Sequence, residues 1–419
     1  MVAAEVREIS ARCHHVLTIA WCGCLALLVV THRVEGQTDP LLLISLDGCR
    51  HDYLERAQTP TLDRLRGSGL HAAGLQPPFP AKTFPSHYTL VTGLHPAHHG
   101  VVDNVIYDPE NDATFALYDR EELHRSRWWR GEPIWVTVQR AGMKAAPFHW
   151  PGSEAEIAGL RPTYWEPYDH HMPHRKKIRK VLSFLDMPPE NRPHFITLYF
   201  PDIDTAGHRH GPDGAEVVRA LEQIDHSLGH LVDGLVSRDL LSRIHILIVS
   251  DHGMTSVDSD RTILLDDHID LSDLSFVRTG VVGGLRAPES RLETLYKTLE
   301  NAHPRLRVFY REETPEALHY RSNSLIPPLV LLPQLGWQVL SRRSHERRDW
   351  TRSKGAHGYD GLNPDMHGIF IATGPRIPDP RSLPVVRAVD VYNLMCELLD
   401  VSPASNDGGS FLVDAIAVN

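Results

Sequence analysis

Cysteine is scarce in this sequence, and long apolar runs and an excess of positive charge are lacking too. The chain has five cysteines in 419 residues, and three of them lie within the first 36. The other two, Cys49 and Cys396, stand in apolar surroundings, so we expect two buried thiols and not a disulfide. A chain of this length can bury a large core without such crosslinks.

Positive charge is outweighed by negative charge. Lys and Arg number 43 against 53 Asp and Glu, which gives a formal net charge of −10. A protein that reads duplex nucleic acid through a basic surface is therefore not expected. Histidine, by contrast, is abundant, with 27 residues, and this abundance suggests metal chemistry.

One mostly apolar run stands near the N-terminus. Residues 16–30 are too short for a comfortable transmembrane helix but have the length of a signal-peptide core, and Gly36 supplies a small residue where a signal peptidase needs one. We predict a signal peptide at residues 1–36 and a secreted or periplasmic chain that starts near Gln37 and keeps no stable membrane span. The charged residues before the run sum to zero, so an uncleaved membrane anchor stays the alternative.

Short apolar runs that end in polar residues predict buried strands. These runs are residues 41–46, 194–200, 244–250 and 368–372. Helical stretches lie between them, at 59–68, 83–92, 133–141, 215–235 and 389–399. This alternation predicts an α/β fold with a mostly parallel central sheet and helices on both faces. Residues 258–350 alternate less regularly, and we interpret them as a small α+β insertion into one domain that spans residues 37–419.

The ends of these strands carry candidate metal ligands. Because chemistry in open α/β sheets gathers at the carboxyl ends of the strands, we expect the following residues to meet there. They are Asp47, Asp204, His208, Asp251, His252 and His357. Carboxylates and imidazoles suit zinc, and six such ligands are enough for two ions. A pair of ions can stabilise the attacking and the leaving oxygen in a displacement at phosphorus.

Thr83 is the candidate nucleophile for such a displacement. It opens a predicted helix after a Pro-rich turn, where the helix dipole and free N–H groups favour a phosphate oxyanion. Considered without the other candidate residues, however, a threonine at the start of a helix is more readily explained as a simple N-cap, whose side chain only caps the first N–H groups of the helix.

The chain resembles the ectonucleotide pyrophosphatase/phosphodiesterase family of the alkaline phosphatase superfamily, in particular its bacterial members with a single catalytic domain. The resemblance covers roughly residues 40–415. Its motifs occur in this order: TFPSH at 83–87, VDN at 102–104, YDP at 107–109, WPGS at 150–153, DTAGHRHGP at 204–212, DHGM at 251–254 and HGYD at 357–360. The resemblance implies an alkaline-phosphatase-like fold with two Zn²⁺.

The resemblance also implies a role for each residue that matches a motif. One zinc would be held by Asp47, Thr83, Asp251 and His252, and the other by Asp204, His208 and His357. Thr83 would attack phosphorus and form a phospho-threonine, while Asn104 would donate to a phosphate oxygen. Phe84 and Tyr168 match the aromatic pair that sandwiches a nucleobase, and Tyr199 matches a neighbouring pocket residue.

One departure concerns the second ligand set. Many relatives have a Glu-Pro pair where this sequence has Asp202-Ile203, so two carboxylates compete for the ligand position. The spacing to Gly207-His208 favours Asp204, with Asp202 as a supporting residue, and we do not expect His210 to be a ligand.

The function that the resemblance implies is hydrolysis of nucleotide phosphodiesters or phosphoanhydrides to nucleoside 5′-monophosphates. A phosphodiesterase for lysophospholipid or choline-phosphate head groups would share the metal site and differ only in the pocket. A monoester phosphatase is not favoured, because no Arg clamp is found, and a sulfatase lacks its C-x-P-x-R motif. A metal-binding protein without catalysis is disfavoured because no candidate position is missing.

Overall fold

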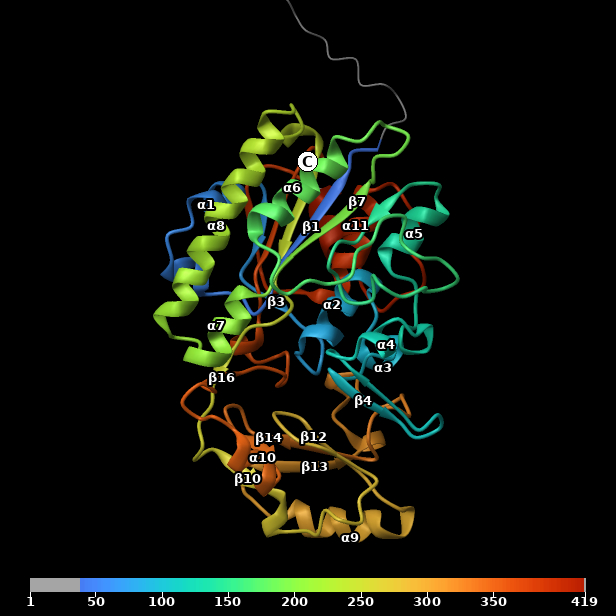
Figure 1. Cartoon of the computed structure of the whole chain (residues 1–419), viewed down its shortest axis with the longest axis vertical. Helices are drawn as coiled ribbons and strands as arrows, with labels where there is room; N and C mark the ends of the chain where they lie inside the picture. Colours follow the sequence, from blue (N-terminus) through green and yellow to red (C-terminus); the bar gives the residue numbers. More distant parts are fainter. Residues whose placement is uncertain (1–37, 418–419) are drawn as a thin grey trace, which may run out of the picture. The chain divides into compact units, whose positions relative to one another are not determined.

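A computed structural model describes residues 38–417, and Figure 1 shows how they are arranged. The signal peptide predicted at residues 1–36 lies outside the described residues and stays a prediction. The central sheet has seven strands in the order β18-β2-β17-β8-β1-β7-β6. In the same order, their bounds are Arg381–Leu383, Leu70–Ala72, Phe370–Thr373, His245–Val249, Leu41–Leu46, Phe195–Phe200 and Ala145–Ala146.

The middle of this sheet is parallel, as the sequence predicts. Strand β1 pairs in parallel with β7 on one side and with β8 on the other. Strand β17 is an exception, since it runs antiparallel to both β8 and β2. The prediction of a mostly parallel sheet is confirmed, but the apolar run at 368–372 gave no sign of this reversed direction, because a buried strand looks the same either way.

Helices cover both faces of the sheet, as predicted. Leu41 and Leu43 of β1 pack into one core cluster, while Leu42, Ile44 and Leu46 pack into another. The first cluster includes residues of α2 (Thr83–Thr92), α5 (Ile134–Arg140) and α11 (Val391–Leu398). The second includes residues of α1 (Pro60–Arg66), α6 (His174–Leu185) and α8 (Ala215–Val236).

A second, antiparallel sheet lies below the central one in the view of Figure 1. Its strands, in order, are β11 (Phe276–Arg278), β12 (Gly283–Arg286), β14 (Leu329–Pro333) and β13 (Leu306–Tyr310). Helix α9 (Glu289–Glu300) packs on it through Leu295 and Leu299 and forms a separate apolar core. These elements fall within residues 258–350, which we continue to interpret as an insertion.

The other helices and strands are short. The helices are α3 (Pro96–His99), α4 (Arg120–Leu123), α7 (Asp202–His210), α10 (Arg342–Arg347) and α12 (Phe411–Ala417). The strands are β3 (Leu75–Gln76), β4 (Val105–Asp108), β5 (Ala113–Ala116), β9 (Thr255–Ser256), β10 (Thr262–Leu264), β15 (Gln338–Leu340), β16 (Gly355–Ala356) and β19 (Val386–Arg387).

The two cysteines of the described chain behave as the composition predicts, since Cys49 and Cys396 are both buried free thiols. Within residues 38–417, no helix combines the length and apolar character that a membrane crossing requires.

Candidate active site

Three neighbouring strands deliver the candidate ligands to one edge of the sheet. Asp47 follows β1, Asp251 and His252 follow β8, and helix α7 with Asp204 follows β7. The backbone links these segments directly, since the N–H of Asp204 donates to the carbonyl oxygen of Asp47 at 3.0 Å. Gly48 permits this approach: its φ is +70°, and a Cβ there would lie 2.8 Å from the Cα of Asp204.

The first predicted ligand set meets around the imidazole of His252. Its Nε2 lies 3.0 Å from Oδ2 of Asp251 and 3.5 Å from Oδ1 of Asp47. The hydroxyl oxygen of Thr83 lies 3.4 Å from the same nitrogen. Four side chains from three separate segments therefore direct their polar atoms to one point.

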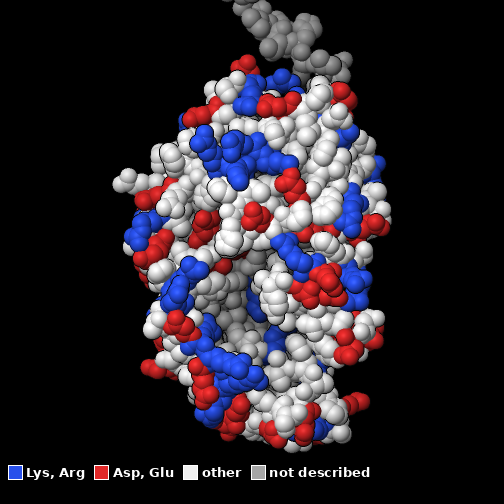
Figure 2. Space-filling model, viewed as in Figure 1, with Lys and Arg blue, Asp and Glu red and all other residues white. Residues whose placement is uncertain are grey.

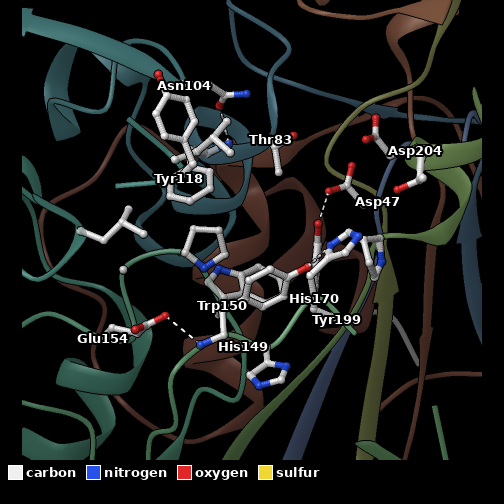
Figure 3. A pocket seen from close by; sticks show the side chains of 18 of the residues that line it. Asp47, Thr83, Asn104, Tyr118, His149, Trp150, Glu154, His170, Tyr199 and Asp204 are labelled. Carbon is white, nitrogen blue, oxygen red and sulfur yellow. Dashed lines mark hydrogen bonds between the residues drawn. The ribbon is translucent and has the colours of Figure 1, made fainter. Parts of the chain in front are cut away.

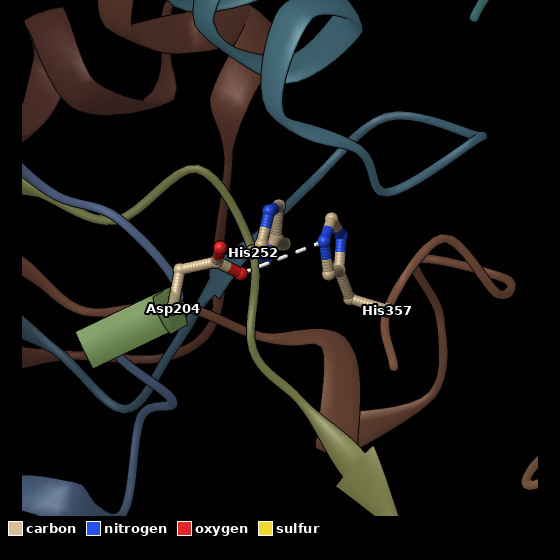
Figure 4. Close-up of side chains that lie close together, drawn as sticks. All are labelled: Asp204, His252 and His357. Atoms are coloured by element: carbon tan, nitrogen blue, oxygen red, sulfur yellow. Dashed lines mark ion pairs between the residues drawn. The ribbon is translucent and has the colours of Figure 1, made fainter. Parts of the chain in front are cut away.

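The second predicted set meets around Asp204. Its Oδ1 lies 3.3 Å from Nε2 of His208, one turn later on α7, and 3.5 Å from Nε2 of His357. Figure 4 shows Asp204, His252 and His357 directed toward one another. The rings of His252 and His357 are stacked with centroids 3.5 Å apart, so the two sets are in direct contact.

The donor atoms of both sets fit a cation site. One carboxylate oxygen each of Asp47, Asp204 and Asp251 is buried without a hydrogen-bond partner in the described structure. The Nδ1 atoms of His208, His252 and His357 each donate to a backbone carbonyl at 2.9 Å. In the neutral imidazole, such a bond keeps the proton on Nδ1 and leaves Nε2 available to a metal, as is usual for histidine ligands.

Electrostatics also favour a cation here. Burial raises the pKa of Asp47 well above its usual value, and the carboxylates of Asp251 and Asp204 raise it further. Such crowding disfavours the ionised carboxylate unless positive charge is supplied. A divalent ion would supply that charge.

His87 joins the first set, although the sequence reasoning did not assign it a role. With Asp47 and Asp251 it forms a cluster whose potential ligand atoms all lie within 4.8 Å of one another. Both of its nitrogens already have partners, since Nε2 contacts Oγ of Ser45 and Nδ1 contacts the carbonyl of Thr83, each at 2.8 Å. We therefore interpret His87 as a support for Asp251, whose Oδ2 is 3.3 Å from Nδ1. Its position four residues after Thr83 could have indicated this.

Thr83 is the first residue of α2 and is not its N-cap. Lys82 holds the N-cap position with extended backbone angles, and no side chain caps the helix. The simple N-cap interpretation of Thr83 is therefore wrong, and its hydroxyl is directed to His252 instead.

Asn104 lies beside the start of the same helix. Its Oδ1 accepts a hydrogen bond of 3.0 Å from the backbone N–H of Phe84. Within residues 38–417 no protein group hydrogen-bonds its Nδ2. This nitrogen is free to donate into the pocket that Asn104 lines together with Thr83 (Figure 3).

A pocket of about 460 Å³ opens from the ligand cluster, which is the size of a small-molecule site. All three aromatic residues predicted to bind substrate line it: Phe84, Tyr168 and Tyr199. The sequence reasoning assigned no role to two further lining residues, His149 and Trp150. Both are buried, and a histidine and a tryptophan next to each other in an apolar stretch look like ordinary core residues, so their place on the wall of a pocket was not evident.

Tyr168 is held by neighbours on the pocket wall. Glu154 accepts from its backbone N–H at 3.0 Å and from Nη1 of Arg120 at 2.8 Å. Arg120 in turn donates to the carbonyl oxygen of Tyr168, and its guanidinium lies 5.9 Å from the centre of the Tyr168 ring. The backbone N–H and the backbone carbonyl oxygen of Tyr168 are therefore both held by hydrogen bonds, and these bonds fix the residue that carries the ring.

Tyr199 connects the pocket to the ligand cluster. Its hydroxyl donates to Oδ2 of Asp47 at 2.5 Å, as the dashed line in Figure 3 shows. The backbone carbonyl of Tyr199 accepts from Nζ of the buried Lys177 at 2.9 Å. This tyrosine thus supports a candidate ligand as well as lining the pocket.

Two neighbours of the ligands are directed elsewhere. Both carboxylate oxygens of Asp202 lie 3.1 Å from Nε2 of His174, so Asp202 does not support the ligand cluster as expected. His210 lies near Glu216, with 3.7 Å between Nδ1 and Oε2, and joins neither set.

The face drawn in Figure 2 carries basic and acidic side chains interspersed, with a hollow below its centre.

The chain matches known proteins over most of its length. Residues 41–360 match the family described as type I phosphodiesterase/nucleotide pyrophosphatase. The chain belongs to this family. Solved structures agree with the assignment: human ectonucleotide pyrophosphatase/phosphodiesterase 5 superposes with a TM-score of 0.85 at 33% identity, covering 91% of this chain and 99% of that one.

Curated relatives of the family are similar at the sequence level. A venom phosphodiesterase of Crotalus durissus collilineatus is 36% identical over 384 residues, which is 89% of this chain and 46% of the relative. Ectonucleotide pyrophosphatase/phosphodiesterase family member 1 of Mus musculus is 36% identical over 387 residues, 89% of this chain and 42% of the relative. The chain thus spans a little under half the length of these relatives.

Proposed function

We propose that this protein is a zinc-dependent phosphodiesterase that hydrolyses nucleotide phosphodiester or phosphoanhydride bonds to nucleoside 5′-monophosphates. One observation carries the proposal: the hydroxyl of Thr83 lies between two carboxylate–imidazole clusters and an aromatic-lined pocket. The clusters suit phosphate, and the pocket suits a nucleobase.

Relatives within the family support this substrate class. Murine ectonucleotide pyrophosphatase/phosphodiesterase 5 has been solved as an inactive threonine-to-alanine variant in complex with AMP, and it superposes on this chain with a TM-score of 0.85 at 31% identity. It covers 91% of this chain, and this chain covers all of it. No observation favours the alternative of a lysophospholipid or choline-phosphate esterase.

The metal ions that we propose are two Zn²⁺. One would be held by Asp47, Thr83, Asp251 and His252. The other would be held by Asp204, His208 and His357. When bound, zinc ions supply positive charge that polarises the phosphate and favours ionisation of a neighbouring hydroxyl.

The residues of the chain then divide the reaction between them. The hydroxyl of Thr83 gives its proton to water, and Oγ forms a bond to phosphorus. The bond between phosphorus and the leaving-group oxygen breaks, and that oxygen departs with the electron pair and takes up a proton. Nδ2 of Asn104 donates to a phosphate oxygen. Water then attacks the phospho-threonine, which releases the nucleoside monophosphate and restores Thr83.

The aromatic residues hold the nucleoside during both steps. Phe84 follows the nucleophile directly, so a base stacked on it keeps the phosphate within reach of Thr83. Tyr168 offers a second face for stacking from the opposite segment of the pocket. Stacking accepts every base, so we propose the nucleotide as the substrate class and no single base.

The decisive experiment compares two esters. Purified protein is assayed with zinc present and after zinc removal, on nitrophenyl thymidine 5′-monophosphate and on nitrophenyl phosphorylcholine. We expect zinc-dependent turnover dominated by the nucleotide ester. Faster turnover of the choline ester would move the function to lipid head groups, and no turnover of either would leave only a metal-binding role.

We also propose a secreted or periplasmic location, based on the predicted signal peptide. An uncleaved anchor stays the alternative, and N-terminal sequencing of the protein from its native host decides between them. Cleavage near Gln37 is the expected result.

A further inference from the structure

A buried ion pair joins the two segments that carry Thr83 and Asn104. Nζ of Lys82, the residue before Thr83, lies 2.9 and 2.7 Å from the two carboxylate oxygens of Asp103, the residue before Asn104. The side chain of Lys82 is 12% exposed and that of Asp103 is 3% exposed. The pair therefore fixes the nucleophile segment against the segment of the proposed oxyanion donor.

The second sheet contributes another cation to this pair. Arg278, the last residue of β11, places Nη1 3.4 Å from Oδ2 of Asp103, and its side chain is only 5% exposed. Its Nη2 donates to the hydroxyl of Tyr320 at 3.3 Å, and that hydroxyl donates to the carbonyl of Val102 at 2.9 Å. Two residues from outside the central sheet thus hold residues 102 and 103 in place.

Lys82 also runs against the segment of a candidate metal ligand. Gly358 follows His357 and has a φ of +118°, and a Cβ there would lie 3.0 Å from Cε of Lys82 and 2.6 Å from Cγ2 of Val281. Only glycine leaves room for both side chains at this point. On the same segment, Nδ1 of His357 donates to the carbonyl of Ala81. The nucleophile, the oxyanion donor, one ligand and the second sheet therefore meet at Lys82.

We infer that Arg278, acting through Asp103 and Lys82, is a positioning residue that holds Thr83 and Asn104 in catalytic register. The inference rests on the proposed function, and it makes the second sheet a required part of the catalytic apparatus. The reason for a second cation is geometric. Lys82 alone neutralises Asp103, so Arg278 is not needed for charge balance, but a guanidinium fixed by Tyr320 restricts where the carboxylate can lie.

The same contacts explain why turnover depends on this arrangement while binding does not. Oδ1 of Asp103 accepts from the backbone N–H of Asn104 at 2.8 Å, so a shift of the carboxylate shifts the donor. Small misplacements of reacting groups are costly in rate. Tyr168, by contrast, lies on another segment of the chain, and among the described residues no hydrogen bond or ion pair joins it to Arg278.

The test compares R278M with R278K and a matched control, R286M. Arg286 is also a buried arginine of the second sheet, but it donates to the backbone carbonyls of Ser324 and Ile326, and no ion pair joins it to Asp103. Steady-state kinetics on nitrophenyl thymidine 5′-monophosphate and thermal unfolding are measured for all three variants and the wild type.

We expect R278M to lower kcat by about tenfold or more while KM changes by less than about twofold. The reason is that the relative position of Thr83 and Asn104 matters in the transition state and not for binding of the substrate. R278K should recover most of kcat, and R286M should keep it. A kcat of R278M within about twofold of the wild type would overturn the inference. An equal loss of kcat in R286M would do so too, because the effect would then be general to the sheet.

Amide hydrogen exchange gives a readout that does not depend on activity. The N–H groups of Asn104 and Val105 donate to Oδ1 of Asp103, so R278M should speed their exchange by about tenfold and R286M should not. Unchanged exchange in R278M overturns the inference even where kcat falls. A wild type that does not hydrolyse the nucleotide ester refutes the proposed function, whereas an active R278M refutes only the inference.

Discussion

The side-chain oxygen of Asn104 accepts a 3.0 Å hydrogen bond from the backbone N–H of Phe84. This single contact fixes which end of the amide faces the pocket, because the nitrogen must then lie on the other side. It also ties Asn104 to the first turn of α2, whose first residue is Thr83. The proposed nucleophile Thr83, the residue Phe84 on which we propose the base stacks and the proposed oxyanion donor Asn104 are therefore held together as one local unit.

Substituting Thr83 by alanine should abolish turnover, by at least about 1,000-fold, because no other hydroxyl replaces it as nucleophile. The fold and the zinc content should largely remain, since the other proposed ligands of that ion are untouched. Kinetics, circular dichroism and metal analysis check this. Thr83→Ser, which keeps a hydroxyl, is the matched control, and retained turnover in the alanine variant would rule out the nucleophile assignment.

Substituting Asn104 by alanine should lower kcat by about 100-fold with little change in KM, as is typical when one oxyanion donor is removed. Thermal unfolding serves as the control, since the variant also loses the bond to Phe84. If KM rose while kcat stayed constant, Asn104 would be a ground-state binding residue and not an oxyanion donor.

Replacing Tyr168 by alanine should raise KM for nucleotide esters by roughly 5- to 150-fold, since stacking on an aromatic side chain is worth about 1–3 kcal/mol per base. KM for a small nitrophenyl diester without a base should change much less. Tyr168→Phe keeps the ring and loses only the hydroxyl contact with His170, so it should bind nucleotides normally. Equal effects of the alanine variant on both substrates would remove the stacking claim.

Metal removal should destabilise the protein increasingly as pH rises. Burial, followed by Asp251 and Asp204, raises the pKa of Asp47 in the folded chain. In the metal-free protein, Asp47 therefore stabilises the fold fully at a pH below the ordinary pKa of the unfolded chain. This stabilisation is lost as the pH rises through the raised pKa of the folded chain. Chelator-treated protein should show this loss in thermal unfolding, and added zinc should reverse it. The same unfolding midpoint with and without zinc at pH 8 would contradict a buried cation site.

His99 should make the protein acid-labile. Burial lowers its pKa to about 3, so the imidazole stays neutral in the folded chain. The stability that this provides is complete above pH 6.5 and is lost as pH falls toward the folded pKa, with a slope of about 1.4 kcal/mol per pH unit. Denaturant unfolding between pH 6.5 and 4 should show a shallower loss for His99→Gln. A parallel pH dependence of the two proteins would show that His99 is not the titrating group.

Much of the scaffold follows from short-range sequence patterns. The run at 41–46 is strand β1 with those bounds, and the stretch at 83–92 is helix α2 with those bounds. Apolar runs that end in Asp or His correctly located the carboxyl edge of the sheet. These features depend on local periodicity and on which apolar side chains are buried away from water, and both can be read from the order of residues along the chain.

Other features of the site depend on contacts between residues far apart in the chain. Arg278 forms an ion pair with Asp103, which lies 175 positions earlier in the chain. No sequence motif next to either residue predicts this ion pair. His87 and Asp202 show the same difficulty in opposite directions, because the first proved to be near the ligands and the second to face His174. Which partner a buried polar group finds is decided by packing and not by its neighbours in sequence.

The sequence by itself determined the fold class, the family and the residue that opens helix α2, and it supplied the candidate metal ligands. The sequence also predicted that the candidate ligands meet at the carboxyl edge of the sheet, but only the tertiary structure gave the distances between them, because the chain brings these residues from five separate segments. The tertiary structure also placed Arg278 of the second sheet against Asp103, the residue before Asn104. The physical reason is that periodicity records how a segment buries its own apolar face, whereas a site is formed by polar groups that folding places together.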